Sequence, residues 1–128
     1  MARPASKHPT ELELEILKVL WRSGPLAVRQ VRDALARDLA YTSVMTVMTI
    51  MLDKGYLIRR KEGASYVYRP LVTEQATRGQ MLEDLVQRAF DGSAAAVMVN
   101  LLESADLDDA ELSELRSLLK RKAREGKP

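Results

Sequence analysis

The spacing of apolar residues changes twice along this 128-residue chain, and each change marks a change of secondary structure. Across residues 10–54 the apolar positions return every three or four residues, which is typical of helices packed along one face. Across residues 56–69 they alternate on either side of Glu62-Gly63-Ala64, which predicts a β-hairpin. The helical spacing returns after residue 73. The sequence therefore predicts a mainly α-helical chain with one small hairpin.

Three helices are expected before the hairpin. The first starts at Thr10, which forms a capping box with Glu13, and ends at Gly24. The second covers about residues 28–37, and the third covers residues 41–54 or starts one residue later. The side chains expected to face the core are Leu12, Leu14, Ile16, Leu17, Leu20, Trp21, Val28, Val31, Leu35, Val44, Val47, Met48 and Met51.

The order of three helices and then a hairpin is that of a winged helix-turn-helix. The packed face of the hairpin is expected to carry Tyr56, Ile58, Tyr66 and Tyr68. Further helices are expected at residues 73–90, at 94–103, and after Asp108, which caps its helix with Glu111. On the first of these we expect an inward face made of Leu82, Leu85, Val86 and Ala89.

Charge is distributed unevenly. Residues 1–70 hold 12 Lys/Arg and 7 Asp/Glu, a net charge of +5, whereas residues 71–128 hold 8 and 11, a net charge of −3. The whole chain is 46% hydrophobic and 30% charged, as soluble globular proteins are. It has no cysteine, no apolar run long enough to span a bilayer, and no apolar segment behind its charged N-terminus. We expect a cytoplasmic protein without membrane insertion.

The third helix is the most informative segment. Opposite its apolar face lie Thr42, Thr46, Thr49 and Asp53. Exposed helix surfaces usually carry Glu, Lys, Gln or Arg, whereas short hydroxyl and methyl groups suit a helix lying close in a DNA major groove. The alternative is that these threonines are simply tolerated at the surface. The hairpin, with cations at 59–61 and a small tip at Gly63, favours DNA binding because a wing would bring those charges to the phosphate backbone.

The helices after residue 70 are too few and too apolar to bury themselves well. Residues 94–102 in particular would expose apolar side chains on a monomer, and pairing with a second copy would bury them. The side chains expected at this dimer interface are Leu82, Leu85, Val86, Val97, Leu101, Leu102, Leu115 and Leu119. The expected domains are a flexible tail at 1–9, a winged-helix DNA-binding domain at 10–71 and a helical dimerisation domain at 72–128.

Other chemistry has little support in the sequence. His8 is the only histidine, and the carboxylates are scattered over helix surfaces without a partner for acid–base work or metal binding. There is no glycine-rich phosphate loop. The cationic run at 120–124 is expected to offset the dipole of the last helix. We therefore expect no catalytic residues, no metal site and no cofactor.

Five segments together resemble the penicillinase repressors of the BlaI/MecI type, including copper-responsive CopY relatives. The resemblance extends from Thr10 to about Lys122 and is carried by residues 13–21, Val28-Arg-Gln-Val31, residues 40–49, Asp53-Lys-Gly-Tyr-Leu57 and Tyr66-Val-Tyr-Arg-Pro70. It implies a winged-helix homodimer that represses genes by occupying inverted repeats with TACA/TGTA-like half-sites. The residues that the resemblance and the helix pattern together point to as DNA contacts are Tyr41, Thr42, Ser43, Thr46, Thr49, Arg60 and Lys61.

The resemblance also bears on how repression ends. Family repressors of the β-lactam systems are cut at an Asn-Phe bond after a signal from a membrane-bound sensor metalloprotease, and the matching bond here is Asn100-Leu101, without the aromatic residue. CopY relatives sense copper through cysteine pairs, so copper release of that kind is excluded. Ile50 lies where many relatives carry a polar or basic residue, and Met45 is apolar where some relatives have arginine. Affinity should therefore depend more on the wing and on the helix ends.

Two alternatives remain at this point. The chain could be a ligand-sensing winged-helix regulator, although nothing in residues 71–128 marks a pocket. It could also be a winged-helix module that binds another protein and not DNA. A ligand that raises the melting temperature would favour the first alternative, whereas monomeric behaviour with weak, salt-insensitive binding of DNA duplexes would favour the second.

Overall fold

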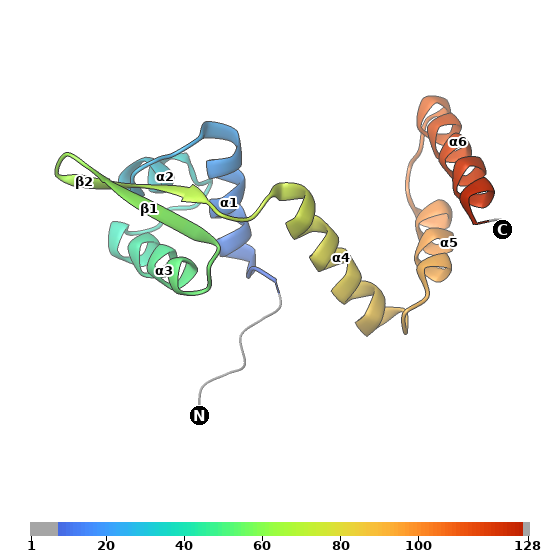
Figure 1. Cartoon of the computed structure of the whole chain (residues 1–128), viewed down its shortest axis with the longest axis horizontal. Helices are drawn as coiled ribbons and strands as arrows, with labels where there is room; N and C mark the ends of the chain where they lie inside the picture. Colours follow the sequence, from blue (N-terminus) through green and yellow to red (C-terminus); the bar gives the residue numbers. More distant parts are fainter. Residues whose placement is uncertain (1–7, 127–128) are drawn as a thin grey trace. The chain divides into compact units, whose positions relative to one another are not determined.

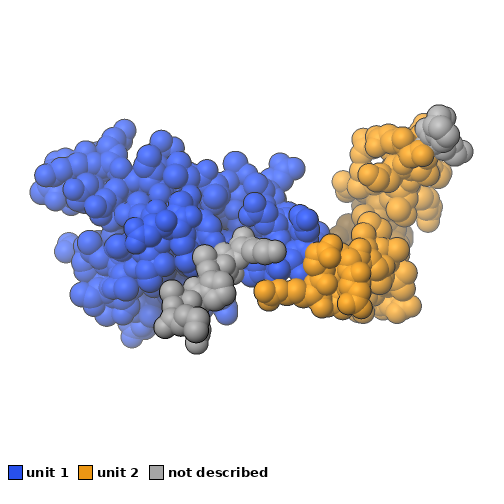
Figure 2. Space-filling model, turned by 60° about the horizontal axis from the view of Figure 1, so that its bottom comes forward, with its two compact units in different colours: residues 1–85 blue, residues 86–128 orange. Residues whose placement is uncertain are grey.

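A computed structural model of the chain describes residues 8–126, so most of the expected tail at 1–9 lies outside the described residues. The chain forms two compact units, Met1–Leu85 and Val86–Pro128 (Figure 2). The boundary between the units falls inside the helix that follows the hairpin. The expected domain boundary at residue 71 is therefore not where the compact units meet, and the functional division into domains stays a prediction.

The first helix of the first unit is α1 (Glu11–Ser23; Figure 1). Its start is fixed by the expected capping box. The Thr10 hydroxyl accepts from the Glu13 amide at 3.3 Å, and the Glu13 carboxylate accepts from the Thr10 amide at 2.8 Å. The helix ends at Gly24, whose φ of 79° favours glycine. One broad face of α1, carrying Ile16, Leu17 and Leu20, is fully buried.

The helix-turn-helix consists of α2 (Val28–Ala34) and α3 (Tyr41–Asp53). The helix α2 is about a turn shorter than expected, because Leu35 takes an extended backbone while its side chain stays in the core. Of the two starts considered for α3, the structure has the earlier, with Ala40 as an N-cap that makes no side-chain hydrogen bond.

The hairpin consists of β1 (Leu57–Glu62) and β2 (Ser65–Pro70), paired antiparallel. The expected packed face was wrong for Ile58, which is exposed and pairs with Arg69, whereas Leu57 is buried near Tyr68. The cause is the turn: Glu62 pairs with Ser65, so the loop has two residues and not three. A one-residue difference in register moves a side chain to the other face of a strand. Tyr66 is likewise exposed, at 41%.

One hydrophobic core joins the elements of the first unit. It contains Ile16, Leu17, Leu20, Val28, Val31, Leu35, Val44, Met48, Met51, Leu57 and Tyr68. A single-residue bridge joins the segment before α2 to the hairpin, since the backbones of Leu26 and Tyr68 exchange hydrogen bonds of 2.8 and 3.2 Å. The indole of Trp21 donates to the Val72 carbonyl at 2.9 Å, which ties α1 to the segment leaving the hairpin. The hairpin is thereby fixed at its base.

The remaining helices are α4 (Glu74–Ala89), α5 (Ala94–Ser104) and α6 (Asp109–Glu125). The expected capping box of Asp108 and Glu111 is present at the start of α6, and Ser93 caps α5. Contrary to the expected inward face of α4, Leu82, Leu85 and Ala89 are exposed in the single chain, and Val86 is half-buried. No described element covers those side chains.

Most apolar side chains of α5 and α6 are also exposed. Val97 is the one hydrophobic residue after position 85 that is buried among those described. Between residues 8 and 126, no helix is both long and apolar enough to cross a membrane.

Candidate nucleic-acid interface

The helix α3 packs its apolar face against the core, so its opposite face is exposed to solvent. Val44, Met48 and Met51 are completely buried against the rest of the core. Thr42, Thr46 and Thr49 all lie on the solvent side of α3, as the spacing predicts. The structure therefore presents a row of short hydroxyl-bearing side chains on a helix that cannot rotate without exposing its apolar face.

The hydroxyl groups of two of these threonines are already oriented. Thr46 Oγ1 donates to the Thr42 carbonyl and Thr49 Oγ1 donates to the Met45 carbonyl, both at 2.9 Å. Each hydroxyl oxygen keeps lone pairs that can accept a hydrogen bond, and each side chain also carries a methyl group. Such a side chain can accept from the amino group of adenine or cytosine and can contact the methyl group of thymine.

The first turn of α3 is also open to solvent. Tyr41 is 41% exposed, and Ser43 is exposed beside it. Ile50 is exposed on the same helix, whereas Met45 is half-buried against the core. The exposed surface of α3 thus bears no charge until Asp53, near its end.

A buried ion pair fixes the far end of α3. Glu13 of α1 is 2% exposed, and its two carboxylate oxygens accept from Lys54 Nζ at 3.1 and 3.0 Å. The same carboxylate caps α1, so one side chain joins two helices. Burial raises the pKa of the neighbouring Tyr56 phenol, an effect that Lys54 opposes and Glu13 adds to.

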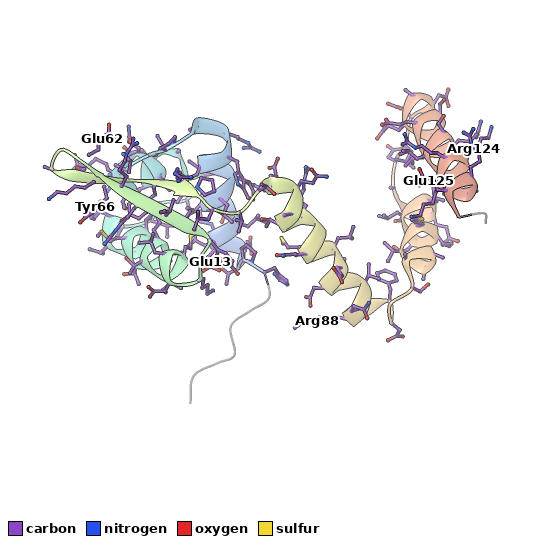
Figure 3. All side chains as sticks on the ribbon, viewed as in Figure 1. Glu13, Glu62, Tyr66, Arg88, Arg124 and Glu125 are labelled. Carbon is purple, nitrogen blue, oxygen red and sulfur yellow. The ribbon has the colours of Figure 1, made fainter. Side chains whose placement is uncertain are left out.

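The sequence did not predict this ion pair, because Glu13 had a sufficient explanation as a cap. Its one signal is position: Glu13 lies three residues before Ile16 and four before Leu17, on the apolar side of α1. Figure 3 labels Glu13 near the start of α1, beside the end of α3.

The two faces of the wing differ in charge. Arg59, Lys61, Tyr66 and Tyr68 share one face, because Arg59 pairs with Tyr68 and Lys61 with Tyr66. The Arg59 guanidinium donates to the Tyr68 hydroxyl at 3.4 Å, and this hydrogen bond raises the pKa of Arg59. The guanidinium also lies 4.2 Å from the centre of the Tyr66 ring. Arg59 is therefore a cation held in a fixed position.

On the other face, Arg60 forms an ion pair with Glu62 at 3.1 Å. The labels of Glu62 and Tyr66 in Figure 3 mark opposite sides of the hairpin, as the register requires. The charge of Arg60 is thus partly offset within the hairpin, whereas Arg59 and Lys61 have no acidic partner among the interactions of residues 8–126.

The residues expected at a dimer interface are on the surface of the single chain, with one exception. Leu82, Leu85, Leu101, Leu102, Leu115 and Leu119 are each between 39% and 57% exposed, Val86 is half-buried and Val97 is buried. Between α5 and α6 runs an apolar groove of about 780 Å³, lined by Met98, Leu101, Leu102, Ala105, Leu107, Leu115, Leu118, Leu119, Arg121, Lys122 and Glu125.

Asn100 and Leu101 lie inside α5 and are exposed. The Ser104 hydroxyl donates to the Asn100 carbonyl at 2.8 Å, and the Ala105 amide donates to the Leu101 carbonyl at 2.7 Å. Both residues are therefore held in regular helix. A protease that binds its substrate in extended form would have to unwind α5 to reach the bond between them.

The acidic and histidine side chains of residues 8–126 do not gather into a group of three that could hold a metal ion. His8 contacts Asp84 of α4 at 3.0 Å and thereby joins the segment before α1 to that helix.

Comparison with known proteins places the chain in a family. Residues 9–121 match the family model described as penicillinase repressor. A transcriptional regulator BlaI of Mycobacterium tuberculosis is 34% identical over 105 residues, covering 79% of this chain and 76% of the relative. A penicillinase repressor of Bacillus licheniformis is 26% identical over 112 residues, covering 86% and 88%.

Among solved structures, a mutant of MarR from E. coli complexed with operator DNA matches with a TM-score of 0.51 and 14% identity, covering 88% of this chain and 74% of that one. At this identity the match concerns the fold alone, and it supports the winged helix-turn-helix. By its sequence, the chain belongs to the penicillinase repressor family, whose members are winged-helix transcriptional repressors and not enzymes.

Proposed function

We propose that this chain, a DNA-binding repressor by its family, acts as a homodimer that reads inverted-repeat operators with the exposed face of α3. The observation that carries the proposal is the row formed by Thr42, Thr46 and Thr49, exposed on a helix whose opposite face is completely buried. These threonines lie on the second helix of a helix-turn-helix, which is the element that enters the major groove in such folds.

Within this row the roles differ. Thr46 and Thr49 read base edges, because their hydroxyl oxygens can accept while their methyl groups lie in reach of thymine. Thr42 and Ser43, in the first turn, hold phosphates or bases, and Tyr41 contacts the backbone. Half-sites of the TACA/TGTA type are in keeping with this chemistry, since each contains adenine amino groups and thymine methyl groups.

The wing supplies contacts that do not depend on sequence. Arg60 and Lys61 contact the phosphate backbone, and Arg59 joins them because two tyrosines hold it in place. These cations compensate for α3, which bears no positive charge before Lys54.

Two copies are needed to occupy an inverted repeat. The exposed leucines of α4, α5 and α6 support a homodimer, because a single chain leaves them in water. The dimer holds its two α3 helices about 34–36 Å apart, one turn of DNA. We place the protein in the cytoplasm, where its operator is.

The test is fluorescence anisotropy with the full chain on three labelled duplexes: an inverted repeat of TACA/TGTA half-sites, a single half-site, and a scrambled duplex of equal composition. We expect the inverted repeat to bind at least about tenfold more tightly than either control at physiological salt. Equal binding of all three would contradict sequence reading by a dimer.

A second candidate function has one observation in its favour. The groove between α5 and α6 has the volume and the mostly apolar lining of a small-molecule site, with three charged residues among those that line it. A ligand-sensing regulator would bind an apolar molecule there. Such a molecule would raise the melting temperature and change the affinity for DNA, whereas a dimer that fills the groove with its own side chains would respond to none.

Release from DNA is proposed to follow cleavage of the Asn100–Leu101 bond, downstream of a membrane-bound sensor metalloprotease. Exposure of both residues supports this, and their regular helical hydrogen bonds mean that α5 must first unwind. Incubation of the DNA-bound chain with extracts of induced cells, followed by mass spectrometry of the fragments, would identify the bond. An intact chain that still leaves the DNA would exclude cleavage.

A further inference from the structure

The helix α6 separates most of its charges by sign along its length. Its cap and first two turns carry Asp108, Asp109, Glu111 and Glu114, Arg116 lies near the middle, and the second half carries Lys120, Arg121, Lys122 and Arg124, with Glu125 as the one acidic residue at its end. One face is a stripe of leucines, all between 37% and 57% exposed: Leu112, Leu115, Leu118 and Leu119. At 100° per residue, Glu111 and Lys122 lie on this same stripe, one before the leucines and one after them.

The helix dipole explains only part of this pattern. Acidic groups in the first turn and basic groups in the last turn of a helix stabilise it, and the effect fades within one turn. It does not require that a charge stand on the apolar face. Glu114 and Arg121 lie beyond the terminal turns, on one flank of the stripe, so the dipole accounts for neither of them.

Lys122 also lines the apolar groove between α5 and α6, together with Leu115 and Leu119 and with the charged Arg121 and Glu125. A charged group at the end of such a groove is expensive to cover unless its partner carries the opposite charge. The occupant of this surface should therefore be an amphipathic helix with an acidic group at the level of Lys122.

We propose that a second copy of α6 covers the leucine stripe in antiparallel orientation, so that Glu111 lies at the level of Lys122 of the partner subunit. A two-fold axis across the helices then makes the same contact twice. Leu115 and Leu118 meet near the axis, and Glu114 comes near Arg121 of the partner subunit on the flank. A parallel pair would instead bring glutamate against glutamate and lysine against lysine.

This inference rests on the proposed homodimer and specifies how its two chains pair. Polar residues in an apolar helix seam set the orientation and the register of pairing, often at some cost in stability. Glu111 and Lys122 would have that effect here. The leucines alone would permit a parallel pair. In so short a seam, the like-charge contacts of Glu111 and Lys122 would be enough to exclude it.

The test reverses the charge of Glu111 and the charge of Lys122, first separately and then together. Glu111→Lys and Lys122→Glu are made singly and together in the full chain, and the dimer dissociation constant is measured by sedimentation equilibrium at low ionic strength. We expect each single reversal to weaken the dimer about tenfold, because two attractive contacts become repulsive. The double reversal should restore the wild-type constant, since opposite charges meet again.

Two features keep the result interpretable. Glu111→Lys also removes a 3.3 Å capping contact to the Asp108 amide, but the double variant lacks that contact too, so restoration cannot come from the cap. Arg124→Glu is the matched control, because it reverses a charge in the same last turn but, at 100° per residue, on the opposite side of α6 from the leucine stripe. It should leave the dissociation constant unchanged.

The outcomes separate this inference from the proposed function. If the wild type is monomeric at all concentrations, both fail. If it dimerises but single reversals change nothing, or the double reversal does not restore the dimer, the antiparallel α6 pairing fails while the homodimer stands.

Discussion

Glu13 is the residue on which the placement of α3 most depends. Its carboxylate caps α1 and binds Lys54 at the end of α3, and almost none of its surface reaches water. A buried carboxylate with two partners is stable only while both remain. The position of the candidate interface is therefore set partly by a polar contact between residues 41 positions apart.

The first prediction follows from that contact. Glu13→Gln keeps the shape of the side chain and a capping acceptor but leaves the Lys54 ammonium without its counter-charge. We expect a loss of about 1–3 kcal/mol in the free energy of unfolding, measured by urea denaturation. Glu11→Gln, in the same turn of α1 but exposed, is the control and should change the free energy much less. Equal effects would show that only the helix dipole matters.

Single residues also show where sequence reasoning reaches its limit. The capping boxes of α1 and α6 were predictable, because both partners lie within four positions of each other. The ion pair of Glu13 and Lys54 was not, since nothing local distinguishes a capping glutamate that is also buried.

Among the elements, α3 was the most predictable. Its apolar residues follow a helical period, and a helix with one buried face must expose the other, so Thr42, Thr46 and Thr49 could be placed before any coordinates. The hairpin was less predictable, because its two strands are short and the turn could be given two residues or three. That one-residue choice decided whether Ile58 or Leu57 is buried.

The second prediction concerns the wing. Arg59→Ala should lower the affinity for every duplex by roughly 3- to 10-fold and make the salt dependence shallower by about one phosphate contact, because a pre-positioned cation is lost. Arg60→Ala should do less, since Glu62 already offsets that charge. Anisotropy titrations at several salt concentrations compare the two. A larger effect for Arg60 would overturn the assignment of Arg59.

For the whole molecule, the sequence predicted two parts with different tasks, a basic winged helix and an acidic helical region. It placed the apolar residues of α5 and α6 correctly on helices, but it expected an inward face on α4 that the single chain does not have. The periodicity of apolar residues cannot distinguish burial against a partner subunit from burial within the chain, because both produce the same apolar stripe.

The third prediction tests the molecule as a dimer on DNA. Inserting about 5 base pairs between the half-sites turns the second half-site to the far side of the duplex, where a dimer with fixed spacing cannot reach it. We expect the affinity to fall to that of a single half-site in the anisotropy assay. An insertion that leaves the affinity unchanged would indicate monomers that bind independently.

The most direct test of the central claim, that the exposed face of α3 reads DNA sequence, is the affinity of Thr46→Ala for the inverted repeat and for the scrambled duplex. The Thr46 hydroxyl bonds only to its own helix and alanine favours helix, so folding should be preserved. Ser117→Ala, exposed on α6, serves as the control. We expect Thr46→Ala to lose about 1–3 kcal/mol on the inverted repeat and little on the scrambled duplex. An equal loss on both duplexes, or none on either, would contradict the claim.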